Sequence, residues 1–284
     1  MRKTLYAMCV FLMAVASLSP RQGESPVLQG PYLGQKPPGS TTELFAPGIV
    51  STPEDEYAFE VSPTGKELIF SRGGKIMIAG QKADGTWTGP DIAPFSGKDI
   101  DGECCFSPDG SRIFFASRRP LAGAKTAGNV WVSEKASGAW GKACPFGKLD
   151  HPKQIHALSV AANGNIYDSG IVRFRFLEGR YSPAERLTPS LDGYSPFVAP
   201  DESYIIFAAR PAGRPATDLY IAFRKKEGTW TDPVRLDDRV NSPFIEGNPF
   251  VTADGKYLFF SRKFDIYWMS ADFIAKLRPP ASGE

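Results

Sequence analysis

Short runs of alternating apolar and polar residues follow one another along most of the chain, and five of them share one layout. Each run meets a four-residue turn and continues as an apolar strand, as in "CFSPDGSRIFFASR" at 105–118. Period-two alternation and turns rich in Pro, Asp and Gly predict β-hairpins rather than helices. The other four segments are "EVSPTGKELIFSR" (60–72), "SVAANGNIYDSG" (159–170), "FVAPDESYIIFAAR" (197–210) and "FVTADGKYLFFSR" (250–262).

The acidic residue in these turns suggests a catalytic or metal-binding role, but its repetition argues against one. Asp109, Asn163, Asp201 and Asp254 occupy the same repeated position. A Pro at the second turn position presets φ, an Asp or Asn side chain bonds back to the backbone, and Gly accepts positive φ. Turn chemistry therefore explains all four residues together, and we interpret them as structural.

A second hairpin follows each of the first four, and an aromatic residue opens its last strand. These aromatics are Trp87, Trp140, Tyr181 and Trp230. We interpret them as packing between repeats rather than as a ligand cage. Four antiparallel strands in roughly 45 residues are typical of a propeller blade. The sequence therefore predicts an all-β fold, a five-bladed β-propeller in preference to one with six blades.

The fifth repeat is incomplete in sequence. The segment "FDIYWMSADFIAKLRPP" (264–280) supplies a third strand and a short helix but no fourth strand. The segment "TTELFAPGIV" (41–50) resembles "GPDIAPFSG" (89–97), the end of the first repeat's outer strand. We expect this N-terminal strand to close the ring, which leaves few exposed edges. The propeller domain would then occupy 41–284, after a Pro- and Gly-rich lead-in at 17–40.

The first twenty residues predict export. Arg2 and Lys3 precede an apolar run, and the small residues that end at Ala16 fit a signal-peptidase site. The apolar run is too short to span a bilayer, so we expect no stable membrane insertion. Cys9 lacks the small residues that precede a lipidated cysteine. We therefore expect a signal peptide at 1–16 and a periplasmic or secreted protein without a lipid anchor.

Charge and cysteine content exclude further classes of function. The chain carries 33 Lys and Arg against 31 Asp and Glu, and the two counts become equal once Arg2 and Lys3 are removed. Without a dense basic run, nucleic acid is not an expected partner. Cys104, Cys105 and Cys144 form no C-x-x-C, so a redox or zinc motif is absent. We interpret these cysteines as small buried apolar residues.

The S-P-D-G turn with its aromatic-rich strand resembles the TolB-like, WD-type (PD40) propeller repeats of exported bacterial proteins. The resemblance covers roughly residues 41–270, and "APDESYIIF" (199–207), "DLYIAFRKKEGTW" (218–230) and "ADGKYLFFSR" (253–262) carry it most clearly. The third repeat departs from the pattern, because "AANGNIYDSG" lacks the proline and the closing arginine. The resemblance implies a propeller but no activity, since the family includes periplasmic scaffolds and domains attached to cell-wall-binding modules.

One end of the predicted channel carries the candidate site. The first strand of a blade lines the channel, and its start meets the end of the antiparallel second strand. We therefore expect arginines from four blades to lie beside acidic, tyrosine and histidine side chains. These residues are Arg72, Arg118, Arg210, Arg262, Glu56, Tyr57, Glu103, His156, Tyr194 and Glu246. The arginines either bind an anionic or sugar-like ligand through paired hydrogen bonds or fasten one blade to the next.

The leading functional prediction is a non-catalytic binding or scaffolding module without a cofactor. Its partner would be a small polar or anionic ligand, a glycan, a peptide or a protein at the channel rim. The alternative is a hydrolase that uses Glu103 and Glu246 as two carboxylates, as glycoside hydrolases do, with His156 as a proton carrier. A protein-docking disc would instead need an exposed apolar patch of several hundred Å².

A hard-cation site is a further hypothesis for one loop. Asp99, Asp101 and Glu103 place acids at alternating positions in "GKDIDGE". Oxygen clusters of this kind suit hard cations, but the calcium-loop pattern does not continue after the glycine. The alternative interpretation is a solvated loop that leads into the channel strand.

Overall fold

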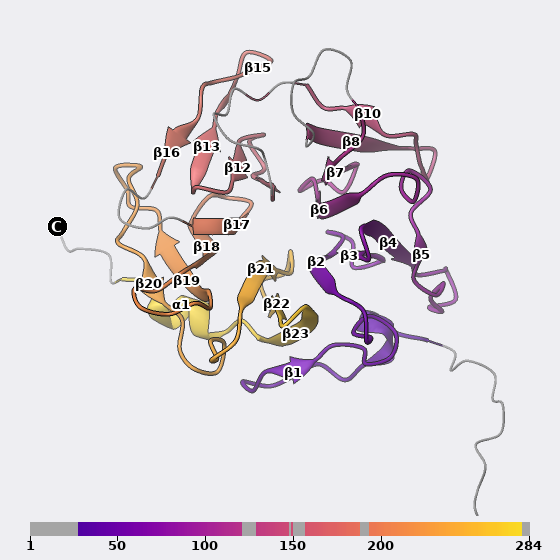
Figure 1. Cartoon of the computed structure of the whole chain (residues 1–284), viewed down its shortest axis with the longest axis horizontal. Coiled ribbons are helices and arrows are strands. Elements are labelled where there is room, and N and C mark those ends of the chain that lie inside the picture. The colour runs from indigo at the N-terminus through magenta and orange to yellow at the C-terminus, as the bar shows by residue number, and fades with distance from the viewer. Residues whose placement is uncertain (1–27, 121–128, 148, 150–156, 188–192, 280–284) are drawn as a thin grey trace, which may run out of the picture.

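The computed structural model describes residues 28–120, 129–147, 149, 157–187 and 193–279 and arranges them as a ring of blades (Figure 1). The prediction of a five-bladed propeller with four-stranded antiparallel blades is confirmed. The predicted signal peptide at 1–16 and His156 lie outside the described residues.

Within each blade the strands pair in order from the channel outward. Blade 1 contains β2 (Glu56–Val61), β3 (Glu67–Arg72), β4 (Lys75–Gly80) and β5 (Asp91–Ile92). Blade 2 contains β6 (Asp101–Phe106), β7 (Arg112–Ser117), β8 (Asn129–Ala136) and β10 (Cys144–Pro145), with β9 (Ala139–Trp140) also paired to β8. Blade 4 contains β17 (Gly193–Val198), β18 (Tyr204–Ala209), β19 (Asp218–Phe223) and β20 (Val234–Arg235).

Blade 3 departs most from this regularity, as its sequence does. Its strands are the short β11 (Ser159–Val160), β12 (Ile166–Asp168), β13 (Val172–Phe174) and β16 (Glu185–Arg186). A separate two-stranded hairpin, β14 (Phe176–Leu177) and β15 (Arg180–Tyr181), lies between its third and fourth strands.

Blade 5 combines residues from both ends of the described chain. It contains β21 (Glu246–Val251), β22 (Tyr257–Arg262), β23 (Asp265–Ser270) and β1 (Glu43–Leu44), which pairs with β23. A buried aromatic cluster joins these segments, with the ring of Phe45 about 5 Å from those of Phe59, Phe259 and Trp268. The short helices η1 (Pro31–Gly34) and α1 (Phe273–Leu277) flank this blade.

The five Pro-, Asp- and Gly-rich turns close as the sequence predicts. In each turn the backbone N–H of the fourth residue donates to the carbonyl of the first, at 2.8 or 2.9 Å. Asp109 accepts hydrogen bonds from the hydroxyl of Ser107 at 2.6 Å and from the N–H of Ser111 at 3.0 Å. These bonds lower the pKa of Asp109 and hold it in the turn, as expected of a structural residue.

The first strands of four blades share a β-bulge at the channel. The register shifts at the same place in β2, β6, β17 and β21, and the bulged residue has positive φ in each. These residues are Ala58, Glu103, Ser195 and Asn248, and all four line the central cavity. Because a bulge re-aims a side chain, this irregularity decides which residues face the axis.

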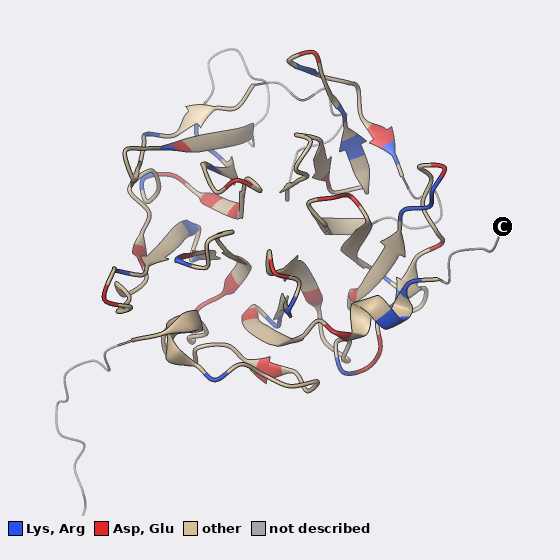
Figure 2. Cartoon of the chain, turned by 180° about the vertical axis from the view of Figure 1, so that it is seen from behind, with Lys and Arg blue, Asp and Glu red and all other residues tan. Residues whose placement is uncertain are grey.

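The ring has two faces that differ in their connections. We call one the rim face: it consists of the starts of the first strands and the turns between second and third strands, such as Gly73–Gly74 and Lys263–Phe264. We call the other the turn face: it consists of the five Pro-, Asp- and Gly-rich turns. Both signs of charge are interspersed around the ring (Figure 2).

Two further sequence expectations can be compared with the structure. Cys104 and Cys105 are buried as expected, but Cys144 is exposed, so that prediction is wrong for Cys144. Its exposure follows from its place on β10, the outermost strand of blade 2. In the described part of the chain, no helix has the length and apolar character needed to cross a membrane.

Candidate functional site

Arg72 and Glu56 form a buried clamp where blade 1 begins. They are register partners on β3 and β2, and Arg72 Nε donates to Glu56 Oε1 at 2.8 Å. Arg72 Nη2 also donates to the carbonyls of Ile49 and Val50, in the segment that leads in from β1. Glu56 is fully buried and accepts hydrogen bonds from the backbone N–H and hydroxyl of Thr52. This arginine therefore fastens the incoming chain to the blade.

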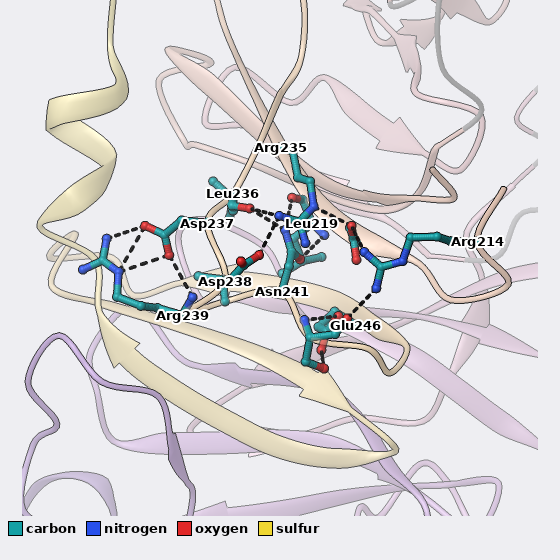
Figure 3. Close-up of polar contacts among 12 residues, drawn as sticks. Arg214, Leu219, Arg235, Leu236, Asp237, Asp238, Arg239, Asn241 and Glu246 are labelled. Atoms are coloured by element: carbon teal, nitrogen blue, oxygen red, sulfur yellow. Dashed lines mark hydrogen bonds and ion pairs between the residues drawn. The ribbon is translucent and has the colours of Figure 1, made fainter. Parts of the chain in front are cut away.

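Arg262 and Glu246 repeat the clamp in blade 5. Arg262 Nε donates to Glu246 Oε1 at 2.9 Å, and its Nη2 donates to the carbonyl of Val240 at 2.8 Å. The N–H and hydroxyl of Ser242 donate to the same carboxylate. Figure 3 shows Glu246 at the edge of a polar network that also contains Arg214, whose Nη2 donates to the Ser242 carbonyl. Burial raises the pKa of Glu246, and its hydrogen bonds with Ser242 and Arg262 oppose that rise.

A third clamp uses Arg119 and not the predicted Arg118. Asp101 stands at the register position of Glu56, and Arg119 Nη2 donates to Asp101 Oδ2 at 2.8 Å. The same nitrogen donates to the carbonyl of Phe95, in the segment that leads into blade 2. Ser96 donates to Asp101 Oδ2 at 2.7 Å, in the role of Thr52 and Ser242. The three clamps share a buried carboxylate, an arginine, a hydroxyl group and a carbonyl of the incoming chain.

The expectation that four arginines occupy equivalent positions is wrong for two of them. Ser117 and Ala209 pair with the first residues of β6 and β17, as Arg72 pairs with Glu56. Arg118 and Arg210 come one residue later, because each follows its turn by eight residues whereas Arg72 and Arg262 follow theirs by seven. Both are exposed, and neither makes an ion pair or a side-chain hydrogen bond with another described residue.

A narrow cavity lies on the axis of the propeller. Residues from all five blades line it, among them the four bulge residues and Ala157 of blade 3. Its volume is about 20 Å³, close to the room that one water molecule needs. The described lining therefore leaves room for about one water molecule at this point of the axis, which favours binding of a larger ligand at a face of the ring.

Glu103 is the central polar group of this cavity. Asn248 Nδ2, from blade 5, donates to Glu103 Oε2 at 2.7 Å, and the N–H of Glu103 donates to Ser71 Oγ at 3.1 Å. Burial raises the pKa of Glu103 to about 7; the hydrogen bond from Asn248 lowers it, and the charge of Asp168 raises it. Near neutral pH this carboxyl group can therefore give up or take up a proton.

Glu60 is a second cavity carboxyl group, and the sequence analysis missed it. Its Oε2 accepts a hydrogen bond from the N–H of Phe106 at 2.7 Å, and burial raises its pKa to about 8. The signal for it was present: Glu60 occupies the register position of Cys105, Phe197 and Phe250, where the other blades have an uncharged residue. Among the described residues, neither Glu60 nor Glu103 forms an ion pair.

The two tyrosines of the predicted site lie in different surroundings. Burial and the charge of Glu103 raise the pKa of Tyr57 to about 12. A Cβ at Gly102 would lie 2.6 Å from the Tyr57 hydroxyl oxygen, so a larger residue at 102 would force the Tyr57 side chain to move. Tyr194, at the equivalent position of β17, is instead exposed on the rim face.

The residues of the two other hypotheses are not brought together. Glu246 belongs to a clamp and does not line the cavity that contains Glu103. Asp99 and Asp101 both pair with Arg119, whereas Glu103 bonds to Asn248. No cluster of three or more His, Cys, Asp or Glu suited to a metal occurs in the described parts of the chain.

Comparison with known proteins identifies structural neighbours only. No protein-family model and no curated protein sequence matches the chain. TolB from Acinetobacter baumannii is 15% identical with a TM-score of 0.49; the alignment covers 78% of this chain and 55% of that one. The tricorn protease is 14% identical, also with a TM-score of 0.49, over 78% of this chain and 26% of its own. A gluconolactonase from Xanthomonas campestris is 13% identical with a TM-score of 0.48, and the alignment covers 87% of this chain and 98% of that one. The likeness concerns the fold and does not indicate an activity.

Proposed function

We propose that this chain is an exported, non-catalytic binding propeller whose rim face takes an acidic peptide segment of a partner protein. The observation that carries the proposal is the pair of exposed arginines, Arg118 and Arg210, on the face where the other arginines are held in clamps. The small axial cavity favours a partner that lies on the face over a molecule that enters the channel. Export rests on the signal-like sequence at 1–16.

The rim face offers a continuous backbone framework for such a partner. The N–H of Arg118 donates to the carbonyl of Ile100 at 2.9 Å, and the N–H of Asp101 donates to Gly74 at 2.9 Å. The N–H of Glu56 donates to Phe264, which joins blade 5 to blade 1. The first bond lies within blade 2, and the other two connect blades 2, 1 and 5, so the side chains that these loops carry stay in fixed relative positions.

Apolar side chains are exposed on this same face. Each has between 44% and 55% of its surface exposed, and they are Ile100, Tyr194, Phe244, Ile245 and Phe264. Protein interfaces combine apolar and aromatic contacts with arginine at their centre and polar groups at their edge. Lys263, whose Nζ lies 3.3 Å from the centre of the Phe244 ring, adds positive charge beside them. An acidic segment with apolar side chains complements this combination.

The proposal is tested by binding of synthetic peptides to the mature chain. Peptides that combine Asp or Glu with Phe, Leu or Ile would be compared with amide-substituted versions, and glycans and inorganic anions would be tested beside them. We expect the acidic peptides to bind, and the double variant Arg118→Ala/Arg210→Ala to bind them at least about tenfold more weakly. Lys66→Ala, an exposed cation on the turn face, is the matched control and should bind normally.

Two outcomes would contradict this function. If the double variant binds the peptides as tightly as the wild type, the two arginines are not part of the binding site. If glycans or small anions bind and no peptide binds, the ligand is a glycan or a small anion and not a partner protein. Because Arg118 and Arg210 make no ion pair or side-chain hydrogen bond with a described residue, we expect both variants to fold, and melting curves would check this.

Hydrolysis is a second candidate, favoured by one observation. Glu60 and Glu103 line one cavity, and the pKa of Glu103 is raised to about 7, a value suited to proton transfer at neutral pH. Turnover of a glycoside or lactone panel that Glu103→Gln abolishes, and Arg118→Ala leaves intact, would support this candidate over the binding module.

A further inference from the structure

A wide groove separates blades 2 and 3 at the turn face. Its volume is about 600 Å³, within the range of sites that hold small organic molecules. Phe114 and Phe146 of blade 2 form one wall, and Phe176 and Tyr181 of blade 3 form the other. Neighbouring rings are 4.9 to 5.7 Å apart between centres, which makes the groove a continuous aromatic surface.

The corresponding position is filled by tryptophan in three other blades. Trp87 and Trp230 each pair with the residue that follows the third strand of their blade, and Trp140 pairs with Lys135 near the end of β8. Tyr181 pairs with Phe176, two residues after the end of β13. Trp140 packs beside Phe106 and donates from Nε1 to Glu67 of blade 1 at 3.0 Å. The indole ring thus fills the space between its own blade and the preceding one.

Blade 3 has a smaller ring at this position and an exposed neighbour. Tyr181 replaces the tryptophan, and its hydroxyl bonds to the Gly164 carbonyl of its own blade at 3.3 Å. The hairpin β14–β15 presents Phe176 beside it, and this ring remains 43% exposed. The groove therefore lacks the indole ring that closes its equivalents, although its walls are aromatic.

The charge at the edge of the groove is also reversed. Glu67 in blade 1 and Arg112 in blade 2 hold equivalent positions, because the carbonyl of each accepts a hydrogen bond from the N–H of the first residue of the preceding turn. Glu67 binds Trp140 and Lys135, whereas Arg112 lines the open groove and pairs with Glu134. The side chains of Arg112 and Glu134 are 50% and 62% exposed, and an ion pair so exposed exchanges partners at little cost.

We propose that the groove between blades 2 and 3 binds an aromatic ring that carries a carboxylate. The ring would lie in the groove and pack against Phe146, Phe176 and Tyr181, beside the position that indole rings hold in the other blades. The carboxylate would bind Arg112 in place of Glu134, through charge-assisted hydrogen bonds. This site lies on the turn face and is separate from the peptide-binding rim face.

The test uses N-acetyl-tryptophan and N-acetyl-tryptophanamide, which share the indole ring and differ in charge, with binding measured by isothermal titration calorimetry on the mature chain. We expect the acid to bind about tenfold more tightly than the amide. Arg112→Gln should remove that difference and keep ring binding. Tyr181→Trp should fill the groove, abolish binding of both probes and leave the melting temperature equal or higher. Lys225→Gln, a cation beside the filled groove of Trp230, should bind like the wild type.

Three results would overturn the proposal. They are no saturable binding of either probe, equal affinity for acid and amide, and normal binding by a folded Tyr181→Trp variant. If Tyr181→Trp does not fold, Phe176→Ala takes its place, because it removes an exposed wall of the groove. Normal binding by Phe176→Ala would contradict the site equally.

Discussion

The first strands of the propeller carry two sets of carboxyl groups that differ in their partners. The clamp set is Glu56, Asp101 and Glu246, each of which is buried and pairs with an arginine. The channel set is Glu60 and Glu103, which line the axial cavity and form no ion pair with a described residue. Glu56 and Glu60 are only four residues apart, and Asp101 and Glu103 only two.

The difference shows that the place of a residue relative to the bulge decides its chemistry. Before the bulge, a carboxyl group meets the end of the second strand and a cation, which compensates for its burial. At or after the bulge a carboxyl group faces the cavity and has no cation beside it. There it can avoid the cost of a buried charge by taking up a proton. The first set therefore holds blades together, and the second remains available for ligand or proton exchange.

The largest expected effect is the loss of a clamp arginine. Arg262→Ala would leave the buried Glu246 carboxylate without its cation, and we expect the free energy of unfolding to fall by about 3–5 kcal/mol. Urea denaturation measures the change. Arg210→Ala on the same face should cost less than about 0.5 kcal/mol. Similar losses for both variants would remove the distinction between clamped and exposed arginines.

The adjacent pair in blade 2 sharpens the same comparison. Arg119→Ala removes hydrogen bonds to Asp101 and to the Phe95 carbonyl, and we expect a loss of about 2–3 kcal/mol. Arg118→Ala should leave stability nearly unchanged and weaken binding at the rim face. Thermal and urea unfolding of the two variants test whether Arg119, and not Arg118, belongs to the clamp. A larger loss of stability for Arg118→Ala would contradict this assignment.

The channel set predicts a pH dependence of stability. The pKa values of Glu103, about 7, and Glu60, about 8, exceed their ordinary value of 4.5. The folded state then binds more protons than the unfolded chain between about pH 4.5 and 8, so stability falls as pH rises through this range and levels off above it. Taken separately, each group should contribute a fall of about 2–4 kcal/mol between pH 5 and 8.

Neutral variants isolate this effect. Glu60→Gln and Glu103→Gln should each flatten the profile and exceed the wild type in stability at pH 8. Glu54→Gln, which replaces an exposed carboxylate on the rim face, should leave the slope unchanged. A rise in wild-type stability from pH 5 to 8 would show that both groups are ionised in the folded state.

The smallest expected effect concerns the hydrogen bond that crosses the channel. Asn248→Ala removes the donor that lowers the pKa of Glu103, so we expect that pKa to rise above about 7, by less than about one unit. NMR titration of the Glu103 carboxyl carbon measures the shift. An unchanged or lower value would indicate that water replaces the amide.

Much of the fold was predictable because repeated local chemistry specified it. The turns around Asp109 and its counterparts, the hairpins and the packing role of Trp87 and Trp140 all follow from spacing and residue type. The rim residues were only partly predictable. Arg72 and Arg262 follow their turns by seven residues and Arg118 and Arg210 by eight, and this count would have separated the two pairs. A charged residue at a repeat position that is uncharged in the other blades would have identified Glu60.

The sequence by itself determined the number of blades, the turns and the set of charged residues near the channel, because turn formation and strand alternation depend on neighbouring residues. Only the tertiary structure decided which carboxyl group meets an arginine and which faces the cavity, because bulges and blade contacts bring together residues as distant in sequence as Glu103 and Asn248. The tertiary structure also decided that the groove between blades 2 and 3 stays open. Only the packing of the blades shows that Tyr181 does not close this groove as tryptophan does in the other blades.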